Sequence, residues 1–150
     1  TALGNGGIFW IAAGLVFTLY KKTRTFGICI LTALVFEVLS CNVILKPLVA
    51  RPRPFTSDPA RILLIPRPED YSFPSGHTAA SFTAVVALSF AGEKRAWKAA
   101  LVLACLIAFS RMYLYVHYPT DVLGGVLVGI LAGYGGYRVV KALEQYKKEK

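Results

Sequence analysis

Long apolar stretches alternate along this chain with short polar or basic segments. The apolar stretches lie at about residues 7–20, 25–45, 78–91, 98–116 and 119–140. A helix crosses the hydrocarbon core of a bilayer with about 20 apolar residues, and the first and third stretches are short for this task. The pattern predicts an all-α, polytopic transmembrane helix bundle of about five spans, formed by a single domain over residues 1–150.

The composition supports a bilayer as the solvent of this chain. Of its residues 55% are hydrophobic and 17% are charged, against about 25% charged in average soluble domains. The alternative is a soluble helical protein with a buried core, but this chain has too little polar surface to cover five apolar segments. Cys29, Cys41 and Cys105 all lie inside apolar stretches, so we expect buried thiols, with no disulfide framework, metal or cofactor.

The net charge of +9 does not indicate nucleic acid as a partner, because most basic residues gather at the ends of the apolar stretches. With five spans, three clusters fall on one side of the membrane, which the positive-inside rule makes cytoplasmic. These clusters are Lys21, Lys22 and Arg24; Lys94, Arg95 and Lys98; and Arg138, Lys141, Lys147, Lys148 and Lys150.

Six further basic residues belong to the opposite side of the membrane, where the positive-inside rule does not predict basic residues. An anionic ligand would explain them, because cations act strongly in a dry, shaped pocket. Contact with lipid headgroups is an alternative for two of them, Arg61 and Arg67. The full set is Lys46, Arg51, Arg53, Arg61, Arg67 and Arg111.

Three stretches with chemically active residues meet on that second side. In KPLVARPRP, residues 46–54, we expect Lys46 to end the second span and the prolines to hold an extended loop. PSGH, residues 74–77, begins the third span, and SRMYLYVHYPTD, residues 110–121, joins the fourth span to the fifth. Because the third and fifth helices both start here, two positive helix ends face the same volume.

The third stretch places a histidine beside a carboxylate. Pro119 suits the first position of a helix, and Asp121 is favoured in the first turn by the helix dipole. His117 then lies just outside the helix, within reach of Asp121. A carboxylate bonded to one ring nitrogen fixes the tautomer and leaves the other nitrogen free as a base or nucleophile.

The start of the third helix and the end of the fourth supply candidate phosphate contacts. Ser75 and Gly76 precede a helix whose free backbone N–H groups suit a phosphate, and glycine permits close approach. Arg111 lies six residues before His117, about 9 Å if the segment is helical, at a depth where arginine is costly and usually functional. Glu37 lies inside the second span, where we expect it to pair with Arg111, line the pocket or make an ordinary interhelical hydrogen bond.

The pattern also predicts the roles of two further segments, a loop and a run of small residues. The polar, proline-rich loop 55–73 is expected to cover the site or lie at the interface. Small residues along 124–136, GGVLVGILAGYGG, predict close helix packing within one protomer, with a dimer face as the alternative.

The three stretches together resemble the type 2 phosphatidic acid phosphatase superfamily. The resemblance rests on Lys46-x6-Arg53-Pro54, on Pro74-Ser75-Gly76-His77, and on Ser110-Arg111-x5-His117-x3-Asp121. Integral members of this family usually have six helices, so the resemblance implies either a further span before Thr1 or a short variant.

The resemblance also implies a role for each matching residue. His117 would attack phosphorus and carry a phosphohistidine, Asp121 would orient it, and His77 would protonate the leaving group and later activate water. The phosphoryl oxygens would be held by Lys46, Arg53, Ser75, Gly76 and Arg111.

The sequence therefore predicts a metal-independent lipid phosphatase of the plasma membrane, with its active site at the outer, extracytoplasmic membrane–water interface. A phosphomonoester or terminal pyrophosphate is the expected substrate, on undecaprenyl pyrophosphate, phosphatidylglycerophosphate, phosphatidate or a lipid A type molecule. Two alternatives are a non-catalytic lipid-phosphate binding or transport protein and a vanadate-dependent haloperoxidase-like enzyme. The motifs do not indicate the oligomeric state.

Overall fold

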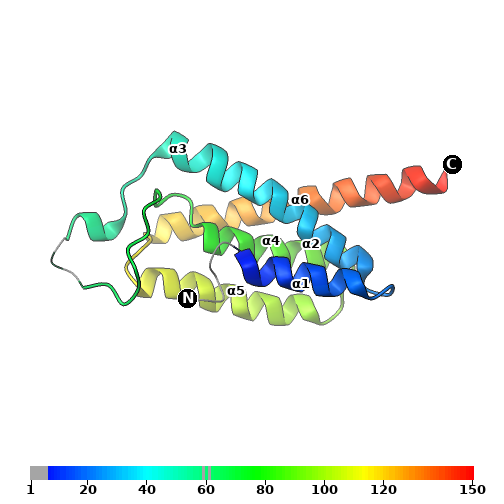
Figure 1. The fold of residues 1–150 in the computed structure, drawn as a ribbon, viewed down its shortest axis with the longest axis horizontal. Helices are drawn as coiled ribbons and strands as arrows, with labels where there is room; N and C mark the ends of the chain where they lie inside the picture. The colour runs from blue at the N-terminus through cyan, green and yellow to red at the C-terminus, as the bar shows by residue number, and fades with distance from the viewer. Residues whose placement is uncertain (1–6, 59, 61) are drawn as a thin grey trace.

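The computed structural model describes residues 7–58, 60 and 62–150, and within these residues the secondary structure is entirely helical. Five helical rods lie side by side, the second of them built from three consecutive segments (Figure 1). The elements are α1 (Ile8–Leu19), α2 (Arg24–Glu37), the π-helix η2 (Val38–Leu45), α3 (Lys46–Val49), the 3-10 turn η3 (Pro54–Thr56), α4 (Gly76–Phe90), α5 (Ala96–Tyr113) and α6 (Pro119–Lys148). The predicted all-α bundle is confirmed. Arg61 lies outside the described residues.

The rods are not equal in length. Three segments are long and apolar enough to cross a membrane: Arg24–Thr56, which holds the second rod and η3, Ala96–Tyr113 and Pro119–Lys148. With 12 and 15 residues, α1 and α4 extend about 18 and 22 Å, short of the ~30 Å hydrocarbon core. The five predicted segments are therefore present, and within residues 7–58, 60 and 62–150 three of them have spanning length.

The second rod continues past the predicted end at Lys46. It runs without a break through η2 and α3 and ends at Val49, where Ala50 takes a left-handed conformation with φ 46°. Pro47 is the second residue of α3 and follows the π-helix directly. The preceding π-helix changes the hydrogen-bond ladder just before this proline, so the helix passes through a residue that we expected to stop it.

Helix α4 is the inner element of the bundle. It contacts α2, α5 and α6, and its buried residues are mostly Ala, Ser and Thr. Large apolar side chains such as Leu15, Val43, Leu106 and Leu131 are instead exposed on the outer helices, as a lipid-facing surface requires. Cys105 is exposed on α5, so its predicted burial is wrong, whereas Cys29 and Cys41 are buried.

The two ends of the bundle differ in character. The α1–α2 turn, the α4–α5 turn and the C-terminus lie at one end, and these are the segments that carry the three basic clusters (Figure 1). The α3–α4 connection and the α5–α6 turn lie at the other end. The structure thereby brings the three chemically active stretches to one end, as the five-helix pattern predicted.

Glycines along α6 allow its backbone to touch α4. A Cβ atom added at Gly125, Gly129 or Gly133 would stand 2.7–2.8 Å from a backbone oxygen of Ser75, Ala79 or Thr83 respectively. Each set advances by four residues, so one face of α6 is in register with one face of α4. The small residues of 124–136 therefore pack within one protomer.

We predict that Gly129→Ala lowers the stability of the folded protein by about 1–3 kcal/mol, because the new methyl group overpacks the α4–α6 contact. Gly135 on the same helix has no atom within 4 Å of its added Cβ, so Gly135→Ala is the matched control and should be neutral or slightly stabilising. Thermal unfolding in detergent measures both. Equal melting temperatures for the two variants would contradict this packing.

Candidate active site

A cavity of about 230 Å³ opens among the residues at the loop end of the bundle. Six of the eight predicted site residues line it, and they come from three separate stretches of the chain. These are Lys46, Arg53, Gly76, His77, Arg111 and His117. Segments far apart in the sequence thus supply two histidines and three fixed cations to one small volume.

The other two predicted residues lie behind the cavity wall. Ser75 is fully buried; its N–H donates to the Asp121 carbonyl at 3.0 Å, and its hydroxyl accepts a hydrogen bond from Thr78 at 3.0 Å. Asp121 is also fully buried and contacts His117 from behind. Neither is among the residues that line the cavity, so Asp121 has the place of a positioning residue, and the expected phosphate contact of Ser75 stays a prediction.

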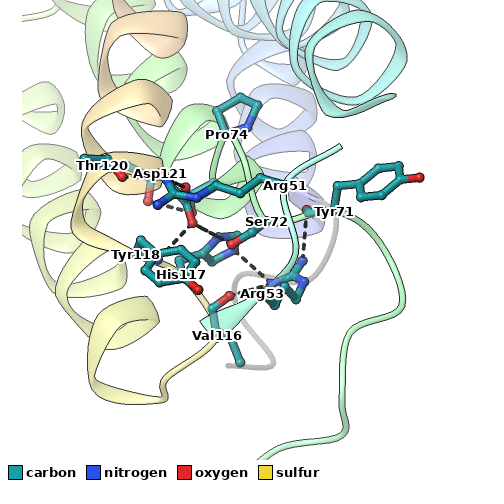
Figure 2. Close-up of polar contacts among 12 residues, drawn as sticks. Arg51, Arg53, Tyr71, Ser72, Pro74, Val116, His117, Tyr118, Thr120 and Asp121 are labelled. Atoms are coloured by element: carbon teal, nitrogen blue, oxygen red, sulfur yellow. Dashed lines mark hydrogen bonds and ion pairs between the residues drawn. The ribbon is translucent and has the colours of Figure 1, made fainter. Parts of the chain in front are cut away.

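Asp121 is held from several directions, as Figure 2 shows. Its Oδ2 accepts hydrogen bonds from the Ser72 hydroxyl at 2.5 Å and the Tyr118 N–H at 2.8 Å. Its Oδ1 accepts one from the Arg51 guanidinium at 2.8 Å, and Arg51 in turn stacks on the Tyr118 ring at 4.1 Å. A buried charge is costly unless it is paired and hydrogen-bonded, and these three donors satisfy it.

His117 lies between this carboxylate and the cavity. Its Nδ1 is 3.6 Å from Asp121 Oδ2, and its Nε2 is 3.3 Å from Arg53 Nη1. A guanidinium has only donors, so Nε2 faces it with a lone pair and the ring proton belongs on Nδ1, toward Asp121. This tautomer leaves the Nε2 lone pair on the cavity side.

The surroundings of His117 favour the neutral form of its imidazole. Burial lowers the pKa of His117 below its ordinary value, the neighbouring Asp121 carboxylate opposes this in part, and the charge of Arg53 adds to the lowering. A neutral ring is the form that can attack an electrophile.

Arg53 is fixed by several acceptors and is buried. Its Nη1 donates to the Val116 carbonyl at 2.9 Å, and its Nε donates to the Asp70 carbonyl at 2.8 Å. Its Nη2 forms an ion pair with Asp70 Oδ1 at 2.6 Å. The guanidinium therefore holds its place beside His117 before any ligand arrives.

Lys46 and Asp70 form the second ion pair of the cavity wall, between Lys46 Nζ and Asp70 Oδ2. Burial alone would raise the pKa of Asp70, but the hydrogen bond and charge of Lys46, followed by those of Arg53, outweigh it and lower that pKa below its ordinary value. Asp70 is thus a carboxylate that bridges two of the predicted phosphate-binding cations.

The start of α4 contributes the other histidine and an open helix end. Gly76 is the first residue of the helix, so the first backbone N–H groups have no partner within it. His77 follows, and its Nε2 is buried on the cavity side with no hydrogen-bond partner. An unpaired ring nitrogen and free N–H groups leave this wall able to bind an anion or exchange a proton.

Arg111 and Glu37 complete the wall. Arg111, in the last turn of α5, is buried, and its guanidinium donates to the Ser110 hydroxyl at 3.1–3.2 Å. Glu37 lines the cavity, is only 3% exposed, and its Oε1 has no hydrogen-bond partner. Of the three expectations for Glu37, the structure supports the pocket-lining one, because no ion pair joins it to Arg111 in the described part of the chain.

From the sequence, Arg51 was named only as one of six basic residues on this side, and Ser72, Asp70 and Asn42 were not singled out as site residues. In the structure Arg51 and Ser72 hold Asp121, Asp70 pairs with two cations, and Asn42 lines the cavity. Arg51 stands two residues before Arg53, and Ser72 three before Ser75, so closeness to a motif was the available signal. No group of three or more His, Cys, Asp or Glu side chains in residues 7–58, 60 and 62–150 is arranged to hold a metal ion.

Comparison with known proteins agrees with this geometry. The family model for the PAP2 superfamily matches residues 8–145. The chain is 33% identical over 144 residues to an undecaprenyl-diphosphatase of Sulfolobus acidocaldarius, covering 93% of this chain and 69% of that protein. It is 30% identical over 146 residues to a lipid A 4'-phosphatase of Bacteroides thetaiotaomicron, covering 89% of this chain and 64% of that protein.

Solved structures give the same result. A transmembrane PAP2-type phosphatidylglycerolphosphate phosphatase from Bacillus subtilis superposes with a TM-score of 0.70 at 29% identity, covering 97% of this chain and 73% of that one. Aquifex aeolicus LpxE also superposes with a TM-score of 0.70, at 32% identity, covering 91% and 80%. The chain spans about two thirds of the length of the two relatives named above. With its motif residues gathered at one cavity and the family model matched over most of its length, this chain belongs to the PAP2 superfamily.

Proposed function

We propose that this protein is a membrane lipid phosphatase that releases phosphate from a phosphomonoester or terminal pyrophosphate through a phosphohistidine. The observation that carries the proposal is the position of His117, whose unprotonated Nε2 faces a cavity walled by three cations while Asp121 lies behind the ring. Relatives named as undecaprenyl-diphosphatase and lipid A 4'-phosphatase support it.

The first half of the reaction uses both histidines. The His117 Nε2 lone pair forms a bond to phosphorus while the bond from phosphorus to the leaving oxygen breaks. That oxygen takes a proton from His77, whose Nε2 is free on the opposite cavity wall. Lys46, Arg53 and Arg111 surround the transferring group, and phosphoryl transfer depends chiefly on such positioning and charge stabilisation.

The second half restores the enzyme. His77, now neutral, accepts a proton from a water molecule whose oxygen attacks phosphorus. The bond between phosphorus and Nε2 breaks, and inorganic phosphate leaves. Asp121 keeps the ring in one orientation throughout, and the donors from Ser72, Tyr118 and Arg51 keep Asp121 in place.

The substrate class follows from the position of the cavity in a lipid-facing bundle. The site lies at the end opposite the basic clusters, so the positive-inside rule would place it outside a plasma membrane. Undecaprenyl pyrophosphate, phosphatidylglycerophosphate, phosphatidate and a lipid A type phosphate all present a terminal phosphate at the surface. Of these, the relatives favour a polyprenyl pyrophosphate, a phosphatidyl phosphate or a lipid A phosphate.

The first prediction concerns the nucleophile. Phosphate release from a panel of lipid phosphates in detergent should persist in excess EDTA and vanish in His117→Ala, because the proposed nucleophilic nitrogen is removed. Tyr113→Ala, an exposed position near the same end, is the control and should keep the wild-type rate. Release that survives in His117→Ala would exclude the histidine mechanism, and release from no lipid at all would favour a binding protein.

The second prediction concerns pH. Because the pKa of His117 is lowered, the neutral nucleophile persists to more acidic pH, and the acid limb of kcat/KM should lie below about 6.5, the ordinary histidine value. Activity should fall as pH drops through that lowered pKa.

Asp121→Asn provides the matched variant for this profile. Removing the carboxylate removes the group that raises the pKa of His117, so the acid limb should move further down. The maximal rate should fall about a hundredfold, the scale of loss when a reacting group is misplaced by about 1 Å. An acid limb that moves upward in this variant would contradict the assignment.

The third prediction concerns Glu37. Its unpaired carboxyl oxygen on the cavity wall should contact the substrate or its bound water, so Glu37→Gln should reduce the rate of phosphate release in a well-folded preparation. Glu144→Gln, a charge removal at the opposite end of the bundle, is the control. Wild-type activity in Glu37→Gln would show that its carboxyl plays no part in turnover.

A further inference from the structure

Asp70 occupies an unusual position, because it is an acidic residue at the centre of a site built for anions. Its two carboxylate oxygens contact two different cations, Oδ2 with Lys46 and Oδ1 with Arg53. It lies in the loop between η3 and α4, and 49% of its side chain is exposed. Lys46 in α3 and Arg53 in the extended segment before η3 therefore supply the cations, and a loop with access to solvent supplies the anion between them.

The carboxylate is not needed to fix Arg53. The guanidinium also donates to the Val116 carbonyl and, through Nε, to the backbone carbonyl of Asp70 itself. Both of these acceptors belong to the main chain and would remain if the Asp70 side chain were neutral. A purely structural role for the carboxylate therefore explains little of the geometry.

The contacts of Asp70 match those that a phosphoryl group would make. A carboxylate presents two oxygens on one atom, and a phosphate meets Lys and Arg through oxygen pairs of the same kind. Arg111 differs from the other two cations: among the described residues its guanidinium contacts only the Ser110 hydroxyl. Two of the three cations are thus covered by Asp70 and the third is open.

We propose that Asp70 is a displaceable counter-anion that fills the phosphate position between Lys46 and Arg53 until substrate replaces it, and that it thereby sets which anions bind. This inference rests on the proposed phosphatase function. A dianionic terminal phosphate replaces the singly charged carboxylate with a net gain in attraction to the cations. A monoanionic phosphodiester, the headgroup linkage of ordinary phospholipids, gains no charge by the exchange.

The consequence is selection by charge in a membrane crowded with phosphodiesters. Such lipids surround the protein in great excess, and an uncovered pair of cations would bind them. Asp70 competes with them on equal charge and from within the same chain, which gives it a high effective concentration. The terminal phosphate of the substrate, with its second negative charge, displaces the Asp70 carboxylate from Lys46 and Arg53.

The test measures anion binding directly, with Asp70→Asn compared with Glu69→Gln. Glu69 is the exposed neighbour in the same loop, so its variant removes the same charge without touching Lys46 or Arg53. Inorganic phosphate and short-chain phosphatidylglycerol, a phosphodiester, are the two probes, and the thermal shift of purified protein in detergent reports binding without turnover. Asp70→Ser is a second neutral variant should Asp70→Asn not fold.

We expect the neutral Asp70 variants to bind phosphate about fivefold more tightly, the order set by losing two partly exposed ion pairs. They should also gain measurable binding of phosphatidylglycerol, while Glu69→Gln matches wild type with both probes. Unchanged or weaker phosphate binding in the neutral Asp70 variants would overturn the proposal, and so would an equal gain in Glu69→Gln. Absence of phosphate binding in every protein would do the same.

The same experiment keeps the two proposals apart. If phosphate binds as expected but no lipid phosphate is hydrolysed, the phosphatase function fails while Asp70 remains a counter-anion of a binding site. If lipid phosphate is hydrolysed but binding does not respond to Asp70, the phosphatase function stands and the counter-anion is rejected.

Discussion

The site depends on one buried carboxylate, that of Asp121, which ties together segments distant in the sequence. Arg51 reaches it from the end of the second rod, Ser72 from the loop before α4, and Tyr118 from the turn before α6. Removing one partner of a buried charge leaves the rest uncompensated, which costs several kcal/mol in proteins generally. The hydrogen bonds that satisfy Asp121 therefore also hold the three motifs of the family in place around His117 (Figure 2).

In this fold, the packing of the helices also determines the geometry of the site. The glycine contact between α6 and α4 continues to the N-terminal ends of both helices. There Gly125 contacts Ser75, and the Ser75 N–H donates a hydrogen bond to the Asp121 carbonyl. A shift of one helix along the other would move His77 relative to His117. Small residues on α6 thus set the distance between the two sides of the cavity, even though they take no part in the reaction.

Much of the fold and of the candidate site was predictable from the sequence, for physical reasons that differ from one residue to another. Hydropathy indicated the five helices, and motif spacing indicated six residues that do line the cavity. The end of the second helix was predicted wrongly, because proline was taken as a stop and the preceding π-helix was not visible in the sequence. Asp70 was missed and the contact of Arg51 with Asp121 was not foreseen, because these roles arise from partners 17 to 70 positions away, which local patterns do not reveal. Cys105 was predicted to be buried because it lies in an apolar stretch. Such a stretch does not show which of its residues face the protein core and which face lipid.

The shortness of α4 has a geometric consequence for the lipid. A helix of about 22 Å whose far end lies at one headgroup layer ends about 8 Å inside the opposite edge of a ~30 Å hydrocarbon core. The helix start with Gly76 and His77 would then lie below the plane of the surrounding headgroups. A lipid phosphate must sink into the protein to reach His77, or the bilayer must thin around the bundle to meet it. In either case the elastic response of the membrane becomes part of the barrier to substrate entry, and the rate should depend on the thickness of the host bilayer.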